Sequence, residues 1–558
     1  MGPAAGVLLN VSGARYIGGM THPALRARGS LLVAGVLGLT MLSGCAPLAA
    51  APSATAPSAT ASTAAAGWHP LEWEVKPGVE LVGFAPEPTT ESDGAAPPPP
   101  GGLIEGRIRN DGIGFAARYV ELPMRHPFND RMKSLLKQAV SDAGGAYQPE
   151  VHPAAAGLAD RGCVPGSLAW SADRVLSDPA TALEGGSGTV ITCELLGEYG
   201  DTVEVGVRVV SGEAGAAIRD DHTVRLYADV THGTLSESVP QWNDVAPVEL
   251  WGDVVEQLRR SHGALSTAPL ADPNEEQVQL VAGALEAARH VADQELRVIL
   301  PPGITSPELD ALGVAPTSEA LEVRLAPDIW APWVSAEMAP LIAQRAMPFV
   351  GLPAWNAALP VDCGFVPCVA VTYDDGPSEF TPKLLDTLRD QHAAATFFQL
   401  GNAAQRFPDI AARAAAEGHE VESHTMRHPD LTTLTPEKAK DEVLDAVKAV
   451  TQITGTQVTC FRPPYGAIND EVLKEVKIPA VLWSIDTNDW REPGRDELIE
   501  RSATVAQPGD IILFHDTHGA TVDAAADVIT ALKNRGYSLV TVKQLFDGSI
   551  PTGKVFRR

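Results

Sequence analysis

The chain has 558 residues, of which 45% are hydrophobic and 20% are charged. These fractions are typical of globular proteins, and the length favours about two to four domains. With 70 acidic against 42 basic residues, the formal net charge of −28 argues against nucleic acid as a partner, because phosphate binding requires clustered Lys and Arg. The same charge suits an exported protein with a soluble, self-repelling surface.

Residues 1–45 have the pattern of an export signal. Arg26 and Arg28 precede a run of apolar and small residues that has the length of a signal-peptide core and is too short for a membrane-spanning helix. The run ends in Leu-Ser-Gly-Cys, which resembles a bacterial lipobox, so Cys45 is the candidate lipidated residue. We therefore expect an extracytoplasmic protein anchored to the cell membrane by lipid. The alternative is an ordinary secretory signal and a secreted protein.

Residues 46–102 are rich in Ala, Pro, Ser and Thr. Such a composition buries too little apolar surface to offset the entropy of ordering, so we expect a flexible tether and linker. Within this stretch, residues 68–84 are more apolar and are predicted to contribute a strand to the region that follows.

Residues 103–350 combine helical and strand patterns. Apolar residues at helical spacing run through 128–140 and stop at a Gly-Gly pair, whereas 202–210 alternate as a half-buried strand. Further helices are predicted around 251–258 and 277–292. We expect an α+β accessory domain of unknown role. Its His and Asp residues lack the spacing of ligands or catalytic groups and are interpreted as solvated surface.

Six cysteines are present, one of them the candidate lipid acceptor. An oxidising compartment permits disulfides. Cys163 could therefore pair with Cys193, and Cys363 with Cys368, although the spacing does not fix the connectivity. Cys460 is then left as a buried thiol.

From residue 361 to 550, apolar runs alternate with helical patterns. Repeated alternation of strands and helices predicts an α/β domain with a parallel sheet, which could be an open sheet or a closed barrel. Polar sequences follow the strands, at the position where barrel folds build their sites. The strands are expected near 368–373, 394–400, 419–423, 458–461, 480–485, 510–514 and 537–542.

Five polar sequences lie at these strand ends. They are TYDDGP with Asp374 and Asp375, SHTMRHPDL with His424 and His428, FRPPYGA with Arg462 and Tyr465, SIDTNDW with Asp486, Asp489 and Trp490, and ILFHDTH with Leu513, His515, Asp516 and His518. Any one of them alone is most simply a satisfied polar side chain. Five in one domain predict a catalytic centre.

His424 and His428 are four residues apart, a spacing that brings two imidazoles to one side of a turn. Alone, this spacing is usually found in surface residues. Pro429 also disfavours a helix through His428, so a short turn is expected. With a carboxylate from another strand end, the set becomes two His and one Asp, which is a first shell for a catalytic zinc-type ion.

One aspartate of the adjacent pair can therefore be a ligand, while the other is suited to take a proton from the attacking water. Arg462 offers a fixed cation that would keep this base ionised and oriented. His515 is suited to protonate the leaving group, and Asp489 to orient its ring.

Residues 368–546 resemble the polysaccharide deacetylase domain, the NodB-like fold of carbohydrate esterase family 4. All five motifs of the family are present in order, over about a third of the chain. The resemblance implies a distorted (β/α) barrel, usually with seven strands. It also implies that Asp374 is the general base and that Asp375, His424 and His428 bind the metal. Zinc is the expected ion, with cobalt as the alternative.

The same resemblance implies roles for the remaining motif residues. Arg462 would brace the base, and the backbone at Tyr465 would help to hold the oxyanion. Asp489 would tune His515, the general acid. The side chains implied to line the slot for the acetyl methyl group are Trp490 and Leu513.

These features predict metal-dependent hydrolysis of N-acetyl groups on amino sugars of a cell-wall polysaccharide. Peptidoglycan N-acetylglucosamine is the preferred substrate, because a tethered lipoprotein would reach the wall. Chitooligosaccharides and acetylated xylan are alternatives by the same chemistry.

Two other classes of function remain open. A non-catalytic wall-binding lipoprotein would use the domain as a scaffold, but such proteins usually lack a base or a ligand and here none is missing. A glycosidase also uses two carboxylates, but they must flank the scissile bond several ångströms apart, and adjacent residues beside a His pair suit a metal better.

Overall fold

The structure is a computed structural model that describes residues 78–84, 102–154, 161–183, 185–264, 268–290 and 295–556. The predicted signal, Cys45 and most of the predicted tether lie outside these residues. Within them, no helix combines the length and apolarity needed to cross a membrane.

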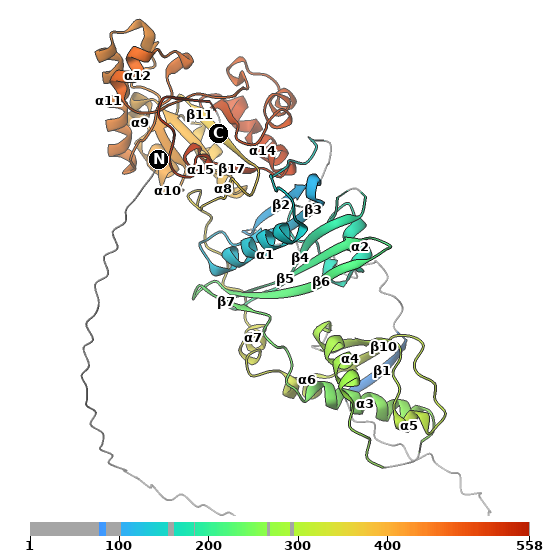
Figure 1. Cartoon of the computed structure of the whole chain (residues 1–558). Coiled ribbons are helices and arrows are strands. Elements are labelled where there is room, and N and C mark those ends of the chain that lie inside the picture. The colour runs from blue at the N-terminus through green and yellow to red at the C-terminus, as the bar shows by residue number, and fades with distance from the viewer. Residues whose placement is uncertain are drawn as a thin grey trace, which may run out of the picture. The chain divides into compact units, whose positions relative to one another are not determined.

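The first sheet of the predicted accessory region has six strands in sequence order, antiparallel except for the parallel β3–β4 pair. Helix α1 (Pro127–Ala143) lies along one face and buries the predicted apolar side chains there (Figure 1). A short helix, α2 (Ala172–Ser177), packs on β4 and β5. The strands are β2 (Ile104–Asn110), β3 (Phe115–Glu121), β4 (Ser187–Tyr199), β5 (Thr202–Glu213), β6 (Ile218–Asp229) and β7 (Thr234–Glu237).

A second, smaller sheet has the order β1-β10-β9-β8 and its own apolar cluster. Its edge strand β1 (Val79–Phe84) pairs with β10 (Leu321–Leu325), which confirms the strand predicted within residues 68–84. The other elements here are β8 (Arg289–His290), β9 (Leu296–Leu300), α3 (Ala246–Ser261), α4 (Glu275–Glu286), α5 (Pro307–Asp310), α6 (Pro327–Trp330) and α7 (Ala339–Gln344).

The C-terminal region is built on parallel strands, as predicted. Their order is β13-β12-β11-β16-β15, and β17 also pairs with β11. The strands are β11 (Cys368–Asp374), β12 (Thr396–Gln399), β13 (Glu420–Ser423), β14 (Ala480–Val481), β15 (Ile485–Asp486), β16 (Ile511–His515), β17 (Ser538–Val540) and β18 (Lys554–Val555).

Beyond β13 the strands close into a distorted α/β barrel. Phe461 forms parallel bridges to Ser423 and to Ala480 of β14, and the stretch 480–486 then reaches β16 through β15. If 480–486 is counted as one strand and Phe461 as another, the barrel has seven strands within the described residues, as the family resemblance implied. Figure 1 shows the helices of this region, in yellow to red, around these strands.

The helices alternate with the strands as the sequence pattern predicts. Helix α11 begins after Thr435, whose side chain accepts from the backbone N–H of Lys438, and it ends at Gly455 with φ 70°. The barrel helices are α8 (Thr381–Asp390), α9 (Gly401–Arg406), α10 (Pro408–Ala416), α11 (Pro436–Thr454), α12 (Asp470–Val476), α13 (Arg495–Ile499), α14 (Gly519–Asn534) and α15 (Val542–Leu545).

The strand predicted at 458–461 is reduced to one residue, Phe461, with an isolated bridge on each side. The backbone N–H groups of Thr459 and Cys460 donate to the side chain of Glu422, at 2.7 and 3.0 Å, and are not part of a ladder. Two prolines follow Arg462 and supply no N–H donors. The prediction of a regular strand here was wrong for these reasons.

Both possible disulfides are formed, between Cys163 and Cys193 and between Cys363 and Cys368. Cys460 is a buried free thiol, as predicted.

Candidate active site

The predicted site residues meet at one edge of the barrel, where the parallel strands end. Asp374 is the last residue of β11 and lies beside His515, the last residue of β16. His424 directly follows β13. Because the carboxyl ends of parallel strands share one edge, residues more than a hundred positions apart converge there.

Asp375, His424 and His428 form a compact group of donor atoms. The Asp375 Oδ1 atom lies 3.4 Å from Nε2 of His424 and 3.4 Å from Nε2 of His428. Ligand atoms about 2.1 Å from a tetrahedral ion are about 3.4 Å apart, so this group fits a zinc-type cation. Oδ1 of Asp375 is also buried without a hydrogen-bond partner, as expected of an atom reserved for a cation.

The second ring nitrogen of each histidine is held by the protein. Nδ1 of His424 lies 2.8 Å from the carbonyl oxygen of Arg462, and Nδ1 of His428 lies 3.1 Å from the Tyr465 hydroxyl. Such contacts fix ring orientation and leave Nε2 free to coordinate. Burial lowers the pKa of His424 to about 3, which keeps its imidazole neutral.

The backbone around this group is strained. Asp375, Thr425, His428 and Tyr465 have φ values of 71°, 70°, 65° and 61°, in the left-handed region that non-glycine residues seldom occupy. Each such residue costs about 1–3 kcal/mol and persists where the surroundings impose it. The clustering of four of them at one strand edge marks a functional site.

Asp374 has a different environment from its neighbour. It is 2% exposed, and its Oδ1 accepts from Nη1 of Arg462 at 2.8 Å. Burial raises the pKa of Asp374, and the Arg462 charge opposes that rise. Arg462 is fully buried and also donates to the Thr372 hydroxyl and to the carbonyl oxygens of Val481 and Leu482. The guanidinium therefore cannot rotate away from the carboxylate.

His515 is paired with Asp489. Its Nδ1 lies 2.8 Å from Oδ1 of Asp489, whose Oδ2 accepts from the His515 backbone N–H and from the Thr521 hydroxyl. Burial lowers the pKa of His515, but the hydrogen bond and charge of Asp489 outweigh it, and the net effect is a rise to about 9. His515 is therefore an imidazolium near neutral pH and holds a proton to donate.

The apolar site residues differ in exposure. Leu513 lies within β16 and is buried, whereas Trp490 is 49% exposed. Tyr465 is 71% exposed, so its ring can contact a ligand from solvent while its hydroxyl reaches His428.

Sequence reasoning assigned no role to three residues that support the site. The Thr372 hydroxyl accepts a hydrogen bond from Arg462, and the Thr521 hydroxyl donates one to Asp489. Asp516 is fully buried, accepts from the Thr381 hydroxyl at 2.6 Å, and lies where a Cβ at Gly376 would clash with it. Thr372 and Asp516 carried a signal, because each stands inside a polar motif, whereas Thr521 carried none.

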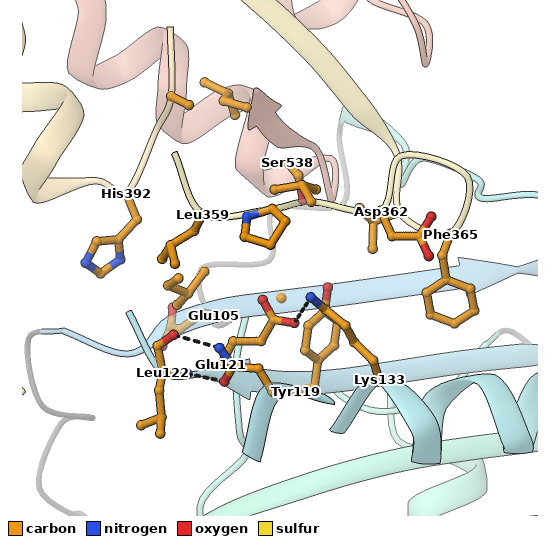
Figure 2. Close-up of a pocket in the computed structure, with 18 of the residues that line it drawn as sticks. Glu105, Tyr119, Glu121, Leu122, Lys133, Leu359, Asp362, Phe365, His392 and Ser538 are labelled. Atoms are coloured by element: carbon orange, nitrogen blue, oxygen red, sulfur yellow. Dashed lines mark hydrogen bonds and ion pairs between the residues drawn. The ribbon is translucent and has the colours of Figure 1, made fainter. Parts of the chain in front are cut away.

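A cavity of about 380 Å³ elsewhere in the molecule is lined by residues of β2, β3 and α1 and by 355–366. Figure 2 shows Lys133 paired with Glu121 there, at 3.5 Å. Its described lining includes none of the predicted site residues, so the catalytic centre is not located there.

Comparison with known proteins identifies the domain. The family model described as polysaccharide deacetylase matches residues 364–479. A peptidoglycan-N-acetylglucosamine deacetylase of Bacillus cereus is 39% identical over 186 residues, which cover 32% of this chain and 87% of the relative. This chain belongs to the polysaccharide deacetylase family.

Other members of the family are similar to about a third of this chain. The peptidoglycan-N-acetylglucosamine deacetylase PgdA of Listeria monocytogenes is 38% identical over 189 residues, 34% of this chain and 41% of the relative. The match thus spans about two fifths of the Listeria protein's length. A chitooligosaccharide deacetylase of Bradyrhizobium is 36% identical over 196 residues, 32% of this chain and 90% of the relative. Among solved structures, a Bacillus subtilis peptidoglycan deacetylase, PdaC, is 38% identical and covers 34% of this chain and 93% of its own, with a TM-score of 0.33.

Proposed function

We propose that residues 361–550 hydrolyse N-acetyl groups of amino sugars in a cell-wall polysaccharide, with peptidoglycan N-acetylglucosamine as the preferred substrate. The observation that carries this proposal is the separation of two adjacent aspartates. Asp375 faces two imidazoles, and Asp374 faces a buried arginine. This is the arrangement that a hydrolase needs for a cation and a nearby base.

Asp375, His424 and His428 would hold the cation, most simply zinc, with cobalt as the alternative. A bound divalent ion would polarise the acetyl carbonyl and acidify a water beside it. Asp374 would take the proton from that water, because Arg462 holds its carboxylate in place and opposes the rise in its pKa that burial causes.

The remaining steps use groups from other strand ends. The attacking water oxygen bonds to the acetyl carbon, and the backbone N–H at Tyr465 would help to hold the oxyanion. The carbon–nitrogen bond then breaks as His515 gives its proton to the departing amine, which leaves acetate and a free amino sugar. Asp489 keeps His515 protonated and oriented for that step. Trp490 and Leu513 would contact the acetyl methyl group and the sugar.

The choice of polymer rests on the relatives and on the N-terminus. Two relatives are named for peptidoglycan and one for chitooligosaccharides. We favour peptidoglycan because a lipid anchor at Cys45, joined by a tether to the folded region that includes β1, would keep the enzyme at the membrane, facing the wall. Chitooligosaccharides and acetyl-xylan remain alternative substrates for the same site.

Acetate release tests the proposal. Wild-type protein loaded with zinc or cobalt should release acetate from peptidoglycan fragments, and Asp374→Asn should not. Asp523→Asn is a matched control, because Asp523 is exposed on α14 and pairs only with Lys383 among the printed contacts of the described chain. Equal background release from wild type and Asp374→Asn would favour a non-catalytic wall-binding protein.

A further inference from the structure

His428 is the candidate metal ligand that lies furthest along the chain from a strand end. His424 directly follows β13, and its backbone N–H donates to the carbonyl oxygen of Gln399 at 2.8 Å. His428 comes four residues later, on a turn, and its side chain is 26% exposed, against 3% for His424. Its ring contacts the hydroxyl of Tyr465, a side chain that is itself mostly exposed. The backbone of the turn must therefore fix the position of this imidazole.

Residues 425–428, the metal-site turn, have a strained backbone. Thr425 and His428 have φ values of 70° and 65°, and such conformations persist where the surrounding structure imposes them. Two of the four backbone N–H groups of the turn have partners close by in the chain. Thr425 donates to the Ser423 hydroxyl at 3.3 Å, and His428 donates to the Thr425 hydroxyl at 3.1 Å. The other two N–H groups need acceptors from another element.

Glu442 of α11 supplies both of these acceptors. Its backbone carbonyl oxygen accepts from the N–H of Met426 at 2.8 Å, and its Oε2 accepts from the N–H of Arg427 at 3.0 Å. The side chain is 7% exposed, and it alone is charged among the buried residues described in α11, where the others are alanine and valine. A carboxylate on an apolar helix face is costly unless it is hydrogen-bonded. Packing alone does not explain this glutamate, whereas its contact with the turn does.

The same carboxylate also pairs with the side chain of Arg427. Oε1 of Glu442 lies 2.6 Å from Nη2 of Arg427. The Arg427 side chain is 69% exposed, and ion pairs that face water contribute little. The contact that constrains the turn is therefore the one between Oε2 and the backbone N–H.

Helix α9 begins against the same turn. The backbone N–H groups of Gly401 and Asn402 donate to the carbonyl oxygens of Thr425 and Met426 at 3.0 and 3.2 Å. A Cβ added to Gly401 would lie 2.3 Å from Sδ of Met426 and 3.0 Å from Cα of Ala446 on α11. The start of α9, the turn and α11 are thus in close contact, and hydrogen bonds from both helices hold the turn.

We propose that Glu442 is a positioning residue of the metal site, which holds the turn in the conformation that places His428 beside Asp375 and His424. This role depends on the proposed function, since it requires that these three residues hold a cation. Metal–ligand distances tolerate deviations of only about 0.2 Å, so a small shift of the turn would weaken binding. Glu442 acts through the turn and contacts no reacting atom.

The zinc affinity of the full chain, measured without substrate, tests this role. Metal-free protein competes for zinc with a chromophoric chelator at pH 7, and Asp375→Ala defines binding outside the site. Glu442→Met keeps a long, helix-forming side chain without an oxygen, and its zinc affinity should fall by about tenfold or more. Glu442→Gln retains an amide oxygen that can accept from the Arg427 N–H, so its affinity should stay within about threefold of wild type.

Two further variants separate positioning from general stability. Arg427→Ala removes the exposed ion pair and keeps the backbone N–H, so it should bind zinc as wild type does. Val450→Ala shortens a buried side chain eight residues further along α11, and it should lower the melting temperature without changing zinc affinity. If Glu442→Met does not fold, Glu442→Asp takes its place, because the shorter side chain withdraws the carboxylate from the Arg427 N–H.

Equal zinc affinity in wild type and Glu442→Met would overturn the positioning role and leave the proposed function intact. A loss in Val450→Ala as large as that in Glu442→Met would also overturn it, because the effect would then follow stability. The same loss in Arg427→Ala would assign the effect to the ion pair and overturn the role of the backbone contact. A wild type that binds zinc no better than Asp375→Ala would contradict the proposed function itself, and the positioning role with it.

Discussion

At the residue scale, the site depends on giving two adjacent carboxylates different neighbours. Asp374 continues the strand and points to a buried guanidinium, while Asp375 has a φ of 71° and turns toward two imidazoles. Two like charges in contact would otherwise raise one pKa strongly. The strained turn therefore separates their roles within one short sequence, and Asp374 and Asp375 are expected to fail in different ways when they are replaced.

Asp375→Ala should lose bound metal, because it removes one of three ligand atoms, whereas Asp374→Ala should keep the metal and lose turnover by at least about a hundredfold. Metal content after gel filtration and acetate release under saturating zinc measure the two effects separately. Equal loss of metal from both variants would show that the assignment of base and ligand is wrong.

The pair of His515 and Asp489 predicts the alkaline limb of the pH–rate profile. The folded pKa of His515 is raised to about 9, so the imidazolium persists until the pH rises through that value and is lost above it. In Asp489→Asn the charge and hydrogen bond that raise the pKa of His515 most are lost, while Asp374 and Asp375 remain, and the alkaline limb should move to lower pH by more than one unit. The measurement is kcat between pH 6 and pH 10, with Asp523→Asn as the control. An unchanged limb in Asp489→Asn would contradict the role given to His515.

The charged and aromatic motif residues of the site could be read from the sequence because each follows a strand. Their supporting contacts could not. Thr372 reaches Arg462 across 90 positions, and Thr521 reaches Asp489 across 32. Thr372 begins the TYDDGP motif and Thr521 lies outside the motifs on α14, but the residue types around them predict neither contact, because each depends on how distant parts of the chain meet in the barrel.

At the element scale, apolar runs predicted six barrel strands well and one poorly. The failure near residue 460 has a local cause, because the side chain of Glu422 takes the backbone N–H groups that a regular strand would share with β13. Hydrophobic periodicity cannot reveal a buried glutamate whose side chain accepts the hydrogen bonds that a neighbouring strand would otherwise accept. Its burial has a measurable consequence for stability.

Glu422 should make the protein less stable as pH rises. Burial, and then the charge of Glu420, raise the folded pKa of Glu422 to about 8, so the folded state holds a proton that the unfolded chain releases near its ordinary value of about 4.3. Where the folded state binds more protons, the free energy of unfolding falls with pH, by up to about 1.4 kcal/mol per unit between these two values.

In Glu422→Gln this fall should be smaller, because glutamine keeps the shape and has no proton to lose. Urea unfolding at pH 5, 6, 7 and 8 measures it, and Glu437→Gln, at an exposed position in the first turn of α11, is the matched control. Parallel curves for wild type and Glu422→Gln would rule out the raised pKa.

At the scale of the whole molecule, composition described the average charge and not which charged side chains meet in the fold. Arg107, Arg118 and His152 look like ordinary polar residues along the chain. They meet only because β2 and β3 pair in one register and residues 152 and 153 reach the same face. The average charge alone still leads to an expectation for how this protein meets an anionic polymer.

The net charge of −28 predicts a salt dependence that differs between substrates. Raising the ionic strength from about 0.1 M to about 1 M shortens the Debye length from about 10 Å to about 3 Å and screens the repulsion between an acidic enzyme and an acidic polymer. We expect kcat/KM on peptidoglycan fragments that carry peptide carboxylates to rise several-fold, whereas kcat/KM on neutral chitooligosaccharides should change less than about twofold. Acetate release on both substrates in NaCl and in KCl measures this, and the second salt excludes an effect of one cation. A rise of equal size on the neutral substrate would mean that salt acts on the enzyme itself, and the repulsion argument would then fail.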